Sequence, residues 1–137
     1  MKRIACVAAA ALAVVLAGGS AVAQDLTGTW VGYESYGAMS GTGDHGISEG
    51  ETSYVSGASQ WTLTIEEMEG GGIHGTNCSP AHCENVVGVV RANGTEIYLA
   101  DEDGLILAEL IGEQMELCYL EHGEDFQIAV CQMMQRQ

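Results

Sequence analysis

Residues 93–124 read NGTEIYLADEDGLILAELIGEQMELCYLEHGE, and this stretch decides the fold. Pairs of turn-forming residues recur in it at intervals of 10, 9 and 11 residues: Asn93-Gly94, Asp103-Gly104, Gly112-Glu113 and Gly123-Glu124. Asn-Gly and Asp-Gly favour type I′ turns, in which both central residues have positive φ, and Gly-Glu suits a type II′ turn. Turns at this spacing predict short antiparallel strands that follow one another in sequence order.

Around these turns, apolar and polar residues alternate with the period of two that a half-buried strand requires. Met115, Leu117 and Tyr119 share one face of their segment, and residues 126–134 alternate in the same way. No segment after the first 23 residues demands a helix. The predicted strands are 27–36, 60–68, 72–78, 85–92, 95–101, 105–111, 114–121 and 126–135.

Eight strands in this order leave two open edges unless the first strand pairs with the last. We therefore predict an all-β fold, an eight-stranded antiparallel up-and-down barrel, with a sandwich of two sheets as the alternative. A barrel of this size is filled by side chains or holds one small ligand. Residues 37–59 are rich in Gly, Ser and Thr, and we predict a long mobile loop there, with a short strand near Tyr54-Val55.

The N-terminus has the layout of a secretory signal peptide. Lys2 and Arg3 precede an apolar run over 4–17, and the small residues Ala21-Val22-Ala23 follow. We expect cleavage before Gln24, which leaves a single domain over 24–137. The alternative, a membrane anchor, needs about 20 apolar residues, and this run is shorter.

The mature chain is strongly acidic. The full sequence has 19 acidic residues against 4 Lys and Arg, a net charge of −15, and loss of Lys2 and Arg3 makes it −17. Binding to nucleic acid or to an anionic membrane surface needs basic side chains that this chain lacks. We expect neither partner, and the sequence leaves the oligomeric state open.

Four cysteines remain after removal of residues 1–23, and four cysteines in a small exported domain predict two disulfides. Cys78 and Cys83 flank a short loop, and Cys118 and Cys131 flank a predicted hairpin turn, so we favour the pairs 78–83 and 118–131. The alternative is a zinc site formed by His74, Cys78, His82 and Cys83, but their spacing matches no zinc motif.

The mature start, Leu26-Thr27-Gly28-Thr29-Trp30, resembles the first strand of the calycins, the lipocalins and avidins. In those families a Gly-x-Trp lays the indole across the closed end of an eight-stranded barrel, and lipocalins bring an Arg from the last strand over it. The resemblance implies a calycin-like barrel in which Gly28 and Arg136 have structural roles. Other small exported barrels, including periplasmic protease inhibitors, begin similarly. A second stretch, 95–104 with 115–121, resembles a group of uncharacterised bacterial exported proteins and implies no function.

Two acidic residues are candidates for the interior. Glu34 alternates onto the face of Trp30, and Glu109 alternates onto the face of Leu105 and Leu107. If those faces point inward, the two carboxylates lie in an apolar cup and could bind a cation or act as acid and base in an isomerase or hydrolase, the weakest of the functions considered. The alternative, which we favour, is that those faces are reversed and the acids face outward, or that the acids lie at the rim of the barrel. The predicted ligand-binding residues are Trp30, Glu34, Trp61, Leu63, Glu109 and Tyr119.

No pattern of catalytic residues is recognisable, and we predict no metal or cofactor. The acidic run Asp101-Glu102-Asp103 lacks the rest of a calcium loop and is interpreted as a solvated hairpin tip. We therefore expect a non-catalytic periplasmic or secreted barrel that binds a small neutral or cationic, apolar or amphiphilic molecule. The alternative function is a protein-binding module, for instance an inhibitor of an exported enzyme.

Overall fold

The computed structural model describes residues 24–41 and 51–137, so the predicted signal peptide lies outside the described residues. The described residues form one antiparallel sheet and contain no helix, and therefore none long and apolar enough to cross a membrane. The strands are β1 (Gly28–Gly41), β2 (Thr52–Gly57), β3 (Thr62–Glu69), β4 (Gly72–Cys78), β5 (Cys83–Val90), β6 (Glu96–Ala100), β7 (Gly104–Ile111), β8 (Gln114–His122) and β9 (Phe126–Arg136).

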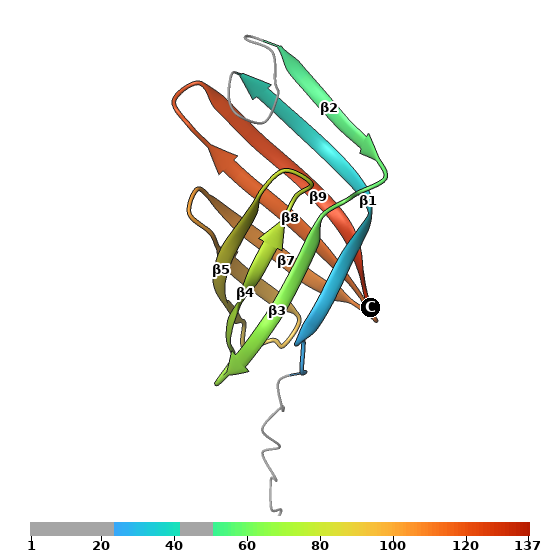
Figure 1. Ribbon diagram of the computed structural model, residues 1–137, viewed down its shortest axis with the longest axis vertical. Coiled ribbons are helices and arrows are strands. Elements are labelled where there is room, and N and C mark those ends of the chain that lie inside the picture. The colour runs from blue at the N-terminus through green and yellow to red at the C-terminus, as the bar shows by residue number, and fades with distance from the viewer. Residues whose placement is uncertain (1–23, 42–50) are drawn as a thin grey trace, which may run out of the picture.

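Pairing of the first strand with the last closes the sheet into a barrel (Figure 1). β1 pairs with β9 from Trp30↔Arg136 to Gly41↔Phe126, and its other edge pairs with β3. The remaining neighbours from β3 to β9 follow sequence order. The predicted eight-stranded barrel is therefore confirmed, and the two-sheet sandwich is wrong.

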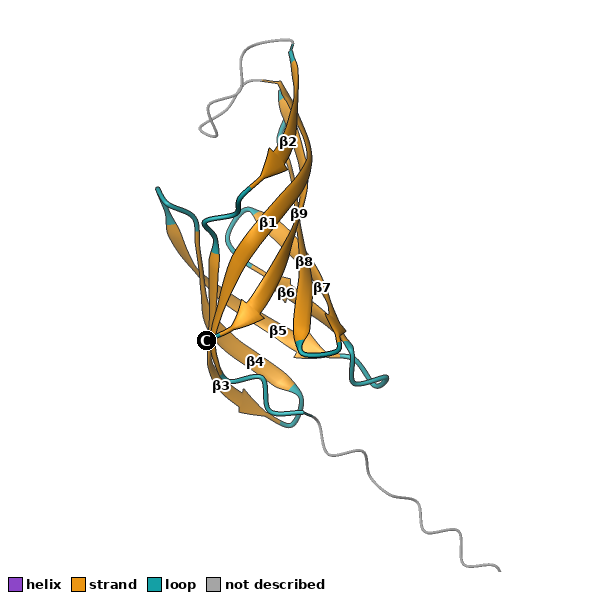
Figure 2. Ribbon diagram, turned by 90° about the vertical axis from the view of Figure 1, so that its right-hand side faces the viewer, coloured by secondary structure: helices purple, strands orange, loops and turns teal. Residues whose placement is uncertain are grey.

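A ninth strand lies outside the barrel and confirms the short strand predicted near Tyr54-Val55. The loop predicted over 37–59 is wrong at its start, where β1 continues, and residues 42–50 lie outside the described part of the chain. β1 continues to Gly41, and β2 pairs with its far half from Ser35↔Gly57 to Ser40↔Thr52. β2 occupies the edge of β1 that β3 leaves free, because β3 pairs with β1 only as far as Val31. The β1–β2 hairpin rises beyond one end of the barrel, which we call the mouth (Figure 2).

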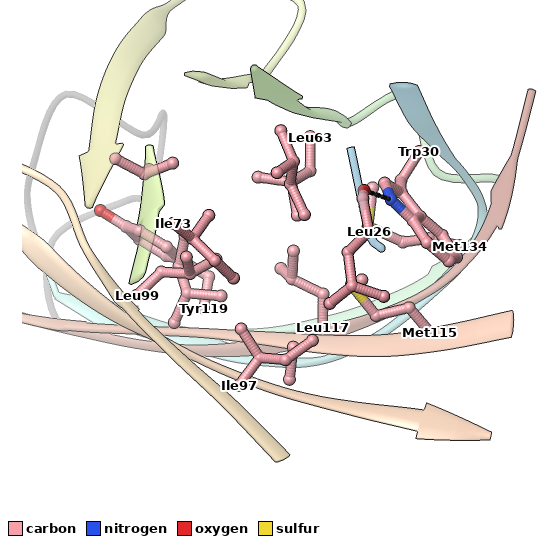
Figure 3. Close-up of a cluster of buried hydrophobic side chains, with 14 of the residues drawn as sticks. Leu26, Trp30, Leu63, Ile73, Ile97, Leu99, Met115, Leu117, Tyr119 and Met134 are labelled. Atoms are coloured by element: carbon pink, nitrogen blue, oxygen red, sulfur yellow. Dashed lines mark hydrogen bonds between the residues drawn. The ribbon is translucent and has the colours of Figure 1, made fainter. Parts of the chain in front are cut away.

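Apolar side chains fill the barrel at the opposite, closed end (Figure 3). Trp30 lies there beside Leu26, and its indole Nε1–H donates a hydrogen bond to the Leu26 carbonyl at 3.0 Å. The fully buried Met115 and Met134 pack in the same region. The segment that precedes β1 thus plugs the barrel at this end.

The closed end also explains the Gly-x-Trp at the start of β1. Gly28 has a φ of 119°, and a Cβ there would lie 3.4 Å from Nε of Arg136. The Arg136 guanidinium lies over the Trp30 ring, with Cζ 5.8 Å from the ring centroid. It donates hydrogen bonds to the carbonyls of Asp25 and Thr27. The structural roles expected for Gly28 and Arg136 are consistent with these contacts.

Both favoured disulfides are present. Cys78 and Cys83 are directly opposite each other in the β4–β5 ladder, and Cys118 and Cys131 are opposite in the β8–β9 ladder. Each bond therefore joins neighbouring strands of a hairpin. Among the described residues, no group of His, Cys, Asp or Glu is arranged to hold a metal ion.

The turns lie where the sequence predicts them, but three of the four differ in type. Gly123 does not have the positive φ that the predicted type II′ turn needs. No described residue other than Gly has positive φ, so Asn93 and Asp103 do not form the predicted type I′ turns. Side chains cap these connections instead. The Asn93 Oδ1 accepts hydrogen bonds from the backbone of Thr95 and Glu96, and the Asp101 Oδ1 accepts one from Gly104 at 2.6 Å.

Candidate functional site

A pocket of about 430 Å³ opens at the mouth of the barrel, and we call it the mouth pocket. The β1–β2 hairpin, the start of β3, the β4–β5 turn and the inward faces of β8 and β9 contribute its walls. The walls are mainly apolar, with a few polar side chains. The lining residues are Met39, Val55, Trp61, Ser79, Ala81, His82, Tyr119, Ile128, Val130 and Gln132.

Two of the six predicted ligand-binding residues line this pocket. Trp61 and Tyr119 contact each other there, with ring centroids 5.7 Å apart and planes tilted by 36°. Trp30 and Leu63 point into the same interior, but both are buried in the packed core (Figure 3). The interior is therefore filled with side chains at the closed end and hollow at the mouth.

Glu34 does not reach the interior, and the expectation that it shares the inward face of Trp30 is wrong. A bulge in β1 places Gly32 opposite Met134 and Glu34 opposite Met133, so that Tyr33 is an extra residue. One extra residue reverses the alternation beyond it. Trp30 therefore points inward before the bulge, Ser35 points inward after it, and Glu34 is exposed.

Glu109 also faces solvent. It shares a face with Leu105 and Leu107 as the sequence predicts, but that face is the outer one. Ile106 and Ala108 fill the inner face. Because β7 is apolar on both faces, its own sequence does not determine which face turns inward. The alternative, in which both acids face solvent, is the arrangement observed.

Gln132 is the polar group of the pocket that the sequence analysis missed. Its side chain is fully buried, its Oε1 accepts a hydrogen bond from the Ser59 hydroxyl, and its Nε2 has no partner among the described residues. Gly32 makes room for this contact, because a Cβ there would lie 2.3 Å from the Ser59 Oγ. A buried amide donor without an acceptor is costly, so a ligand acceptor here would stabilise the complex.

Carboxylate groups lie close to Tyr119, one of the two aromatic residues that line the pocket. The Tyr119 hydroxyl donates a hydrogen bond to the Glu121 Oε2 at 3.1 Å. Burial, followed by the negative charges of Asp101 and Glu121, raises the pKa of Tyr119. Burial and the charge of Asp101 likewise raise the pKa of Glu84. Negative potential therefore surrounds this side of the mouth.

The side-chain amide of Asn77 lies in the same inward layer. Asn77 is almost fully buried, and neither its Oδ1 nor its Nδ2 has a hydrogen-bond partner in the described part of the chain. It is directly opposite Glu84 in the β4–β5 ladder. The interior near the mouth therefore contains buried polar side chains in addition to its apolar walls, in contrast to the apolar closed end.

The two arginines in the described part of the chain lie at the closed end, away from the pocket. Arg136 covers Trp30, and Arg91 follows β5 and forms an ion pair with Glu96. The described residues contain no Lys, so neither charged cation reaches the mouth pocket. The described acids near the mouth are Glu51, Glu84, Asp101, Glu102, Asp103, Glu121, Glu124 and Asp125.

Four apolar lining residues that lie on strands were not among the predicted ligand-binding residues: Met39, Val55, Ile128 and Val130. Met39 and Val55 enter the pocket only because β1 and β2 extend past the barrel. Ile128 and Val130 were correctly predicted to share one face of β9, which is the inner face. That periodicity is the signal that could have identified them.

No protein-family model matches this chain, and neither does any curated protein or solved structure. The function must therefore be argued from the geometry of the site.

Proposed function

We propose that the protein binds a small neutral or cationic amphiphile in the mouth pocket and does so without catalysis. The observation that carries this proposal is the mouth pocket itself, in which an apolar wall surrounds the unpartnered Nε2 of Gln132. The volume of about 430 Å³ is within the range of small-molecule sites, which combine apolar walls with a few polar groups.

Charge selects among the possible ligands. A buried anion needs a cationic partner, and the pocket lining includes no Lys or Arg. The carboxylates around Tyr119 would repel an anionic ligand and attract a cation, and Trp61 and Tyr119 offer aromatic faces to an ammonium group. A carbonyl or hydroxyl oxygen of the ligand would accept a hydrogen bond from Gln132.

The resemblance to calycins and the two disulfides support the proposal from other directions. A calycin-like closed end leaves the opposite end open for a ligand. Disulfides persist in oxidising compartments, which supports export to the periplasm or outside the cell. N-terminal sequencing of the secreted protein tests this last point, and a start at Gln24 is expected.

The ligand test compares octylammonium, octanol and octanoate by native mass spectrometry and by fluorescence. Octylammonium and octanol should bind more tightly than octanoate. Trp61→Phe should abolish the ligand-induced change in emission, because Trp30 is buried away from the pocket. Val130→Phe fills the pocket and should abolish binding, whereas Ala129→Phe, on the outer face of the same strand, should not. A preference for octanoate, or binding unaffected by Val130→Phe, would contradict the proposal.

A further inference from the structure

An apolar area covers the outside of β5 to β8, where an ordinary barrel would present polar residues. We call it the outer apolar face. Leu105 and Val87 are more than half exposed, at 57% and 59%. Single exposed apolar residues are common, but a contiguous group marks an interaction site. The face consists of Val87, Val89, Tyr98, Leu105, Leu107 and Leu120.

The strand register makes these residues contiguous. One row runs from Val89 to Tyr98 and on to Leu107, each directly opposite the next across neighbouring strands. The parallel row runs through Ala100 and contains Leu105 and Leu120, which are also directly opposite. Directly opposite Cβ atoms lie about 5 Å apart, so the side chains form one surface.

Carboxylates border this face on both sides. On one side, Glu96 is directly opposite Glu109, and Glu109 is directly opposite Glu116; we call these three the carboxylate row. On the other side, the acidic turn 101–103 follows β6 directly. The carboxylate row lies on the outer surface of the strands, and at the other border Glu102 and Asp103 are exposed in the turn that joins β6 to β7.

The carboxylate row is unfavourable for the isolated protein, because like charges opposite each other destabilise a sheet. Arg91 pairs with Glu96, and the Tyr36 hydroxyl donates a hydrogen bond to Glu116, so the compensation within the chain is partial. A partner with basic side chains at these positions would relieve the remaining repulsion.

We propose that the outer apolar face docks a basic amphipathic helix of a partner protein, with an apolar strip flanked by Lys or Arg on both sides. Charge complementarity favours this occupant. From Glu109 to Asp103 the chain spans six residues, about 20 Å, and a helix with side chains is about 10–12 Å wide. The helix fits between the two borders, and its basic side chains reach both.

A second copy of the chain is a poor occupant. Any face-to-face pairing of two outer apolar faces places acidic borders against acidic borders, because both borders are acidic. The net charge of the mature chain adds to this repulsion. The surface therefore favours a partner of opposite charge over self-association.

The test uses fluorescence anisotropy with three synthetic peptides of equal length. The first is an amphipathic Leu/Lys helix, the second has Glu in place of Lys, and the third has the Leu/Lys composition in scrambled order. The Leu/Lys helix should bind at least tenfold more tightly than the other two. The double variant Leu105→Ser/Leu107→Ser should lose at least tenfold in affinity.

Further variants distinguish the outer apolar face from the rest of the protein surface. Glu109→Gln/Glu116→Gln should weaken binding and reduce its dependence on salt, with no loss of stability, because it removes opposed charges. Tyr54→Ser, an exposed apolar position on β2, and the pocket-filling Val130→Phe should bind the helix like the parent protein. A failure of the mouth pocket to bind small molecules would leave this result unchanged.

Three results would overturn the proposal. Equal binding of the scrambled peptide would show unspecific charge attraction. Undiminished binding to Leu105→Ser/Leu107→Ser would place the peptide elsewhere. Sedimentation that shows a dimer of the parent protein and a monomer of this double variant would make a second copy the occupant.

Discussion

Arg136→Ala should loosen the closed end of the barrel. The guanidinium of Arg136 lies 5.8 Å from the centroid of the Trp30 ring and donates hydrogen bonds to the carbonyls of Asp25, at 3.1 Å, and Thr27. The last strand is thereby joined to the segment that plugs the barrel. The same segment supplies the Leu26 carbonyl that accepts the indole N–H of Trp30.

The expected loss follows from these contacts. A cation–π contact contributes about 0.5–2 kcal/mol. A hydrogen bond from a charged donor contributes about 1.5–3 kcal/mol when buried, and less here because Arg136 is exposed and water competes for it. A total of about 2 kcal/mol is therefore expected. For a domain of this size, about 4 °C of melting temperature accompanies each kcal/mol, which predicts a fall of roughly 8 °C.

Thermal and urea unfolding followed by Trp fluorescence measure this loss. The native emission should also shift to the red, because the Trp30 indole loses its cover. Arg136→Lys keeps the charge but not the planar fork, and its effect should be intermediate. Arg91→Ala is the matched control, since Arg91 lies over Tyr98 and pairs with Glu96 at the surface. Equal losses in Arg136→Ala and Arg91→Ala would refute the reasoning.

Four other perturbations probe the rest of the molecule. Burial and neighbouring carboxylates raise the pKa of Glu84 above its ordinary value of 4.5. The contribution of Glu84 to stability is therefore present below pH 4.5 and is lost as the pH rises. Glu84→Gln should raise the melting temperature at pH 7 but not at pH 4. Cys118→Ala/Cys131→Ala should lower the free energy of unfolding in urea by about 3 kcal/mol, since it frees a loop of sequence separation 13. Gly75→Ala should lower the urea midpoint by an amount equivalent to roughly 1–3 kcal/mol, because its Cβ would lie 2.0 Å from the Thr64 carbonyl oxygen. Moderate salt should raise the melting temperature by screening the carboxylate row, and a flat response would count against that repulsion.

Turn spacing and alternation were sufficient to predict the barrel. In β8 the polar and apolar residues alternate clearly, so Met115, Leu117 and Tyr119 were correctly assigned to one face, which is the inner one. The disulfides followed from hairpin geometry, because opposite positions in a hairpin are the ones that a disulfide can join. These features depend on residues that are close in sequence.

The pairing of β2 and the outward orientation of Glu34 and Glu109 depend on contacts between segments that are distant in the sequence. β2 has little apolar alternation, and among the described strands it pairs only with the far half of β1. The bulge at Tyr33 arises from the pairing of β1 with β9, more than 90 residues away, and it turns Glu34 outward. In β7 both faces are apolar, so its neighbours decide which face is buried. Alternation within one strand reports none of these effects.

The distribution of charge limits what either proposed site can bind. Arg136 is engaged with Trp30 and two carbonyls, and Arg91 is engaged with Glu96 and Tyr98. Both lie at the closed end, where Arg91 covers Tyr98 at the edge of the outer apolar face and is neutralised by Glu96. An anionic ligand would therefore have to displace an internal partner before it met a cation, and the mouth pocket has no Lys or Arg in its lining. Neutral and cationic partners face no such cost, so the two proposals share one electrostatic requirement although they concern different faces of the barrel.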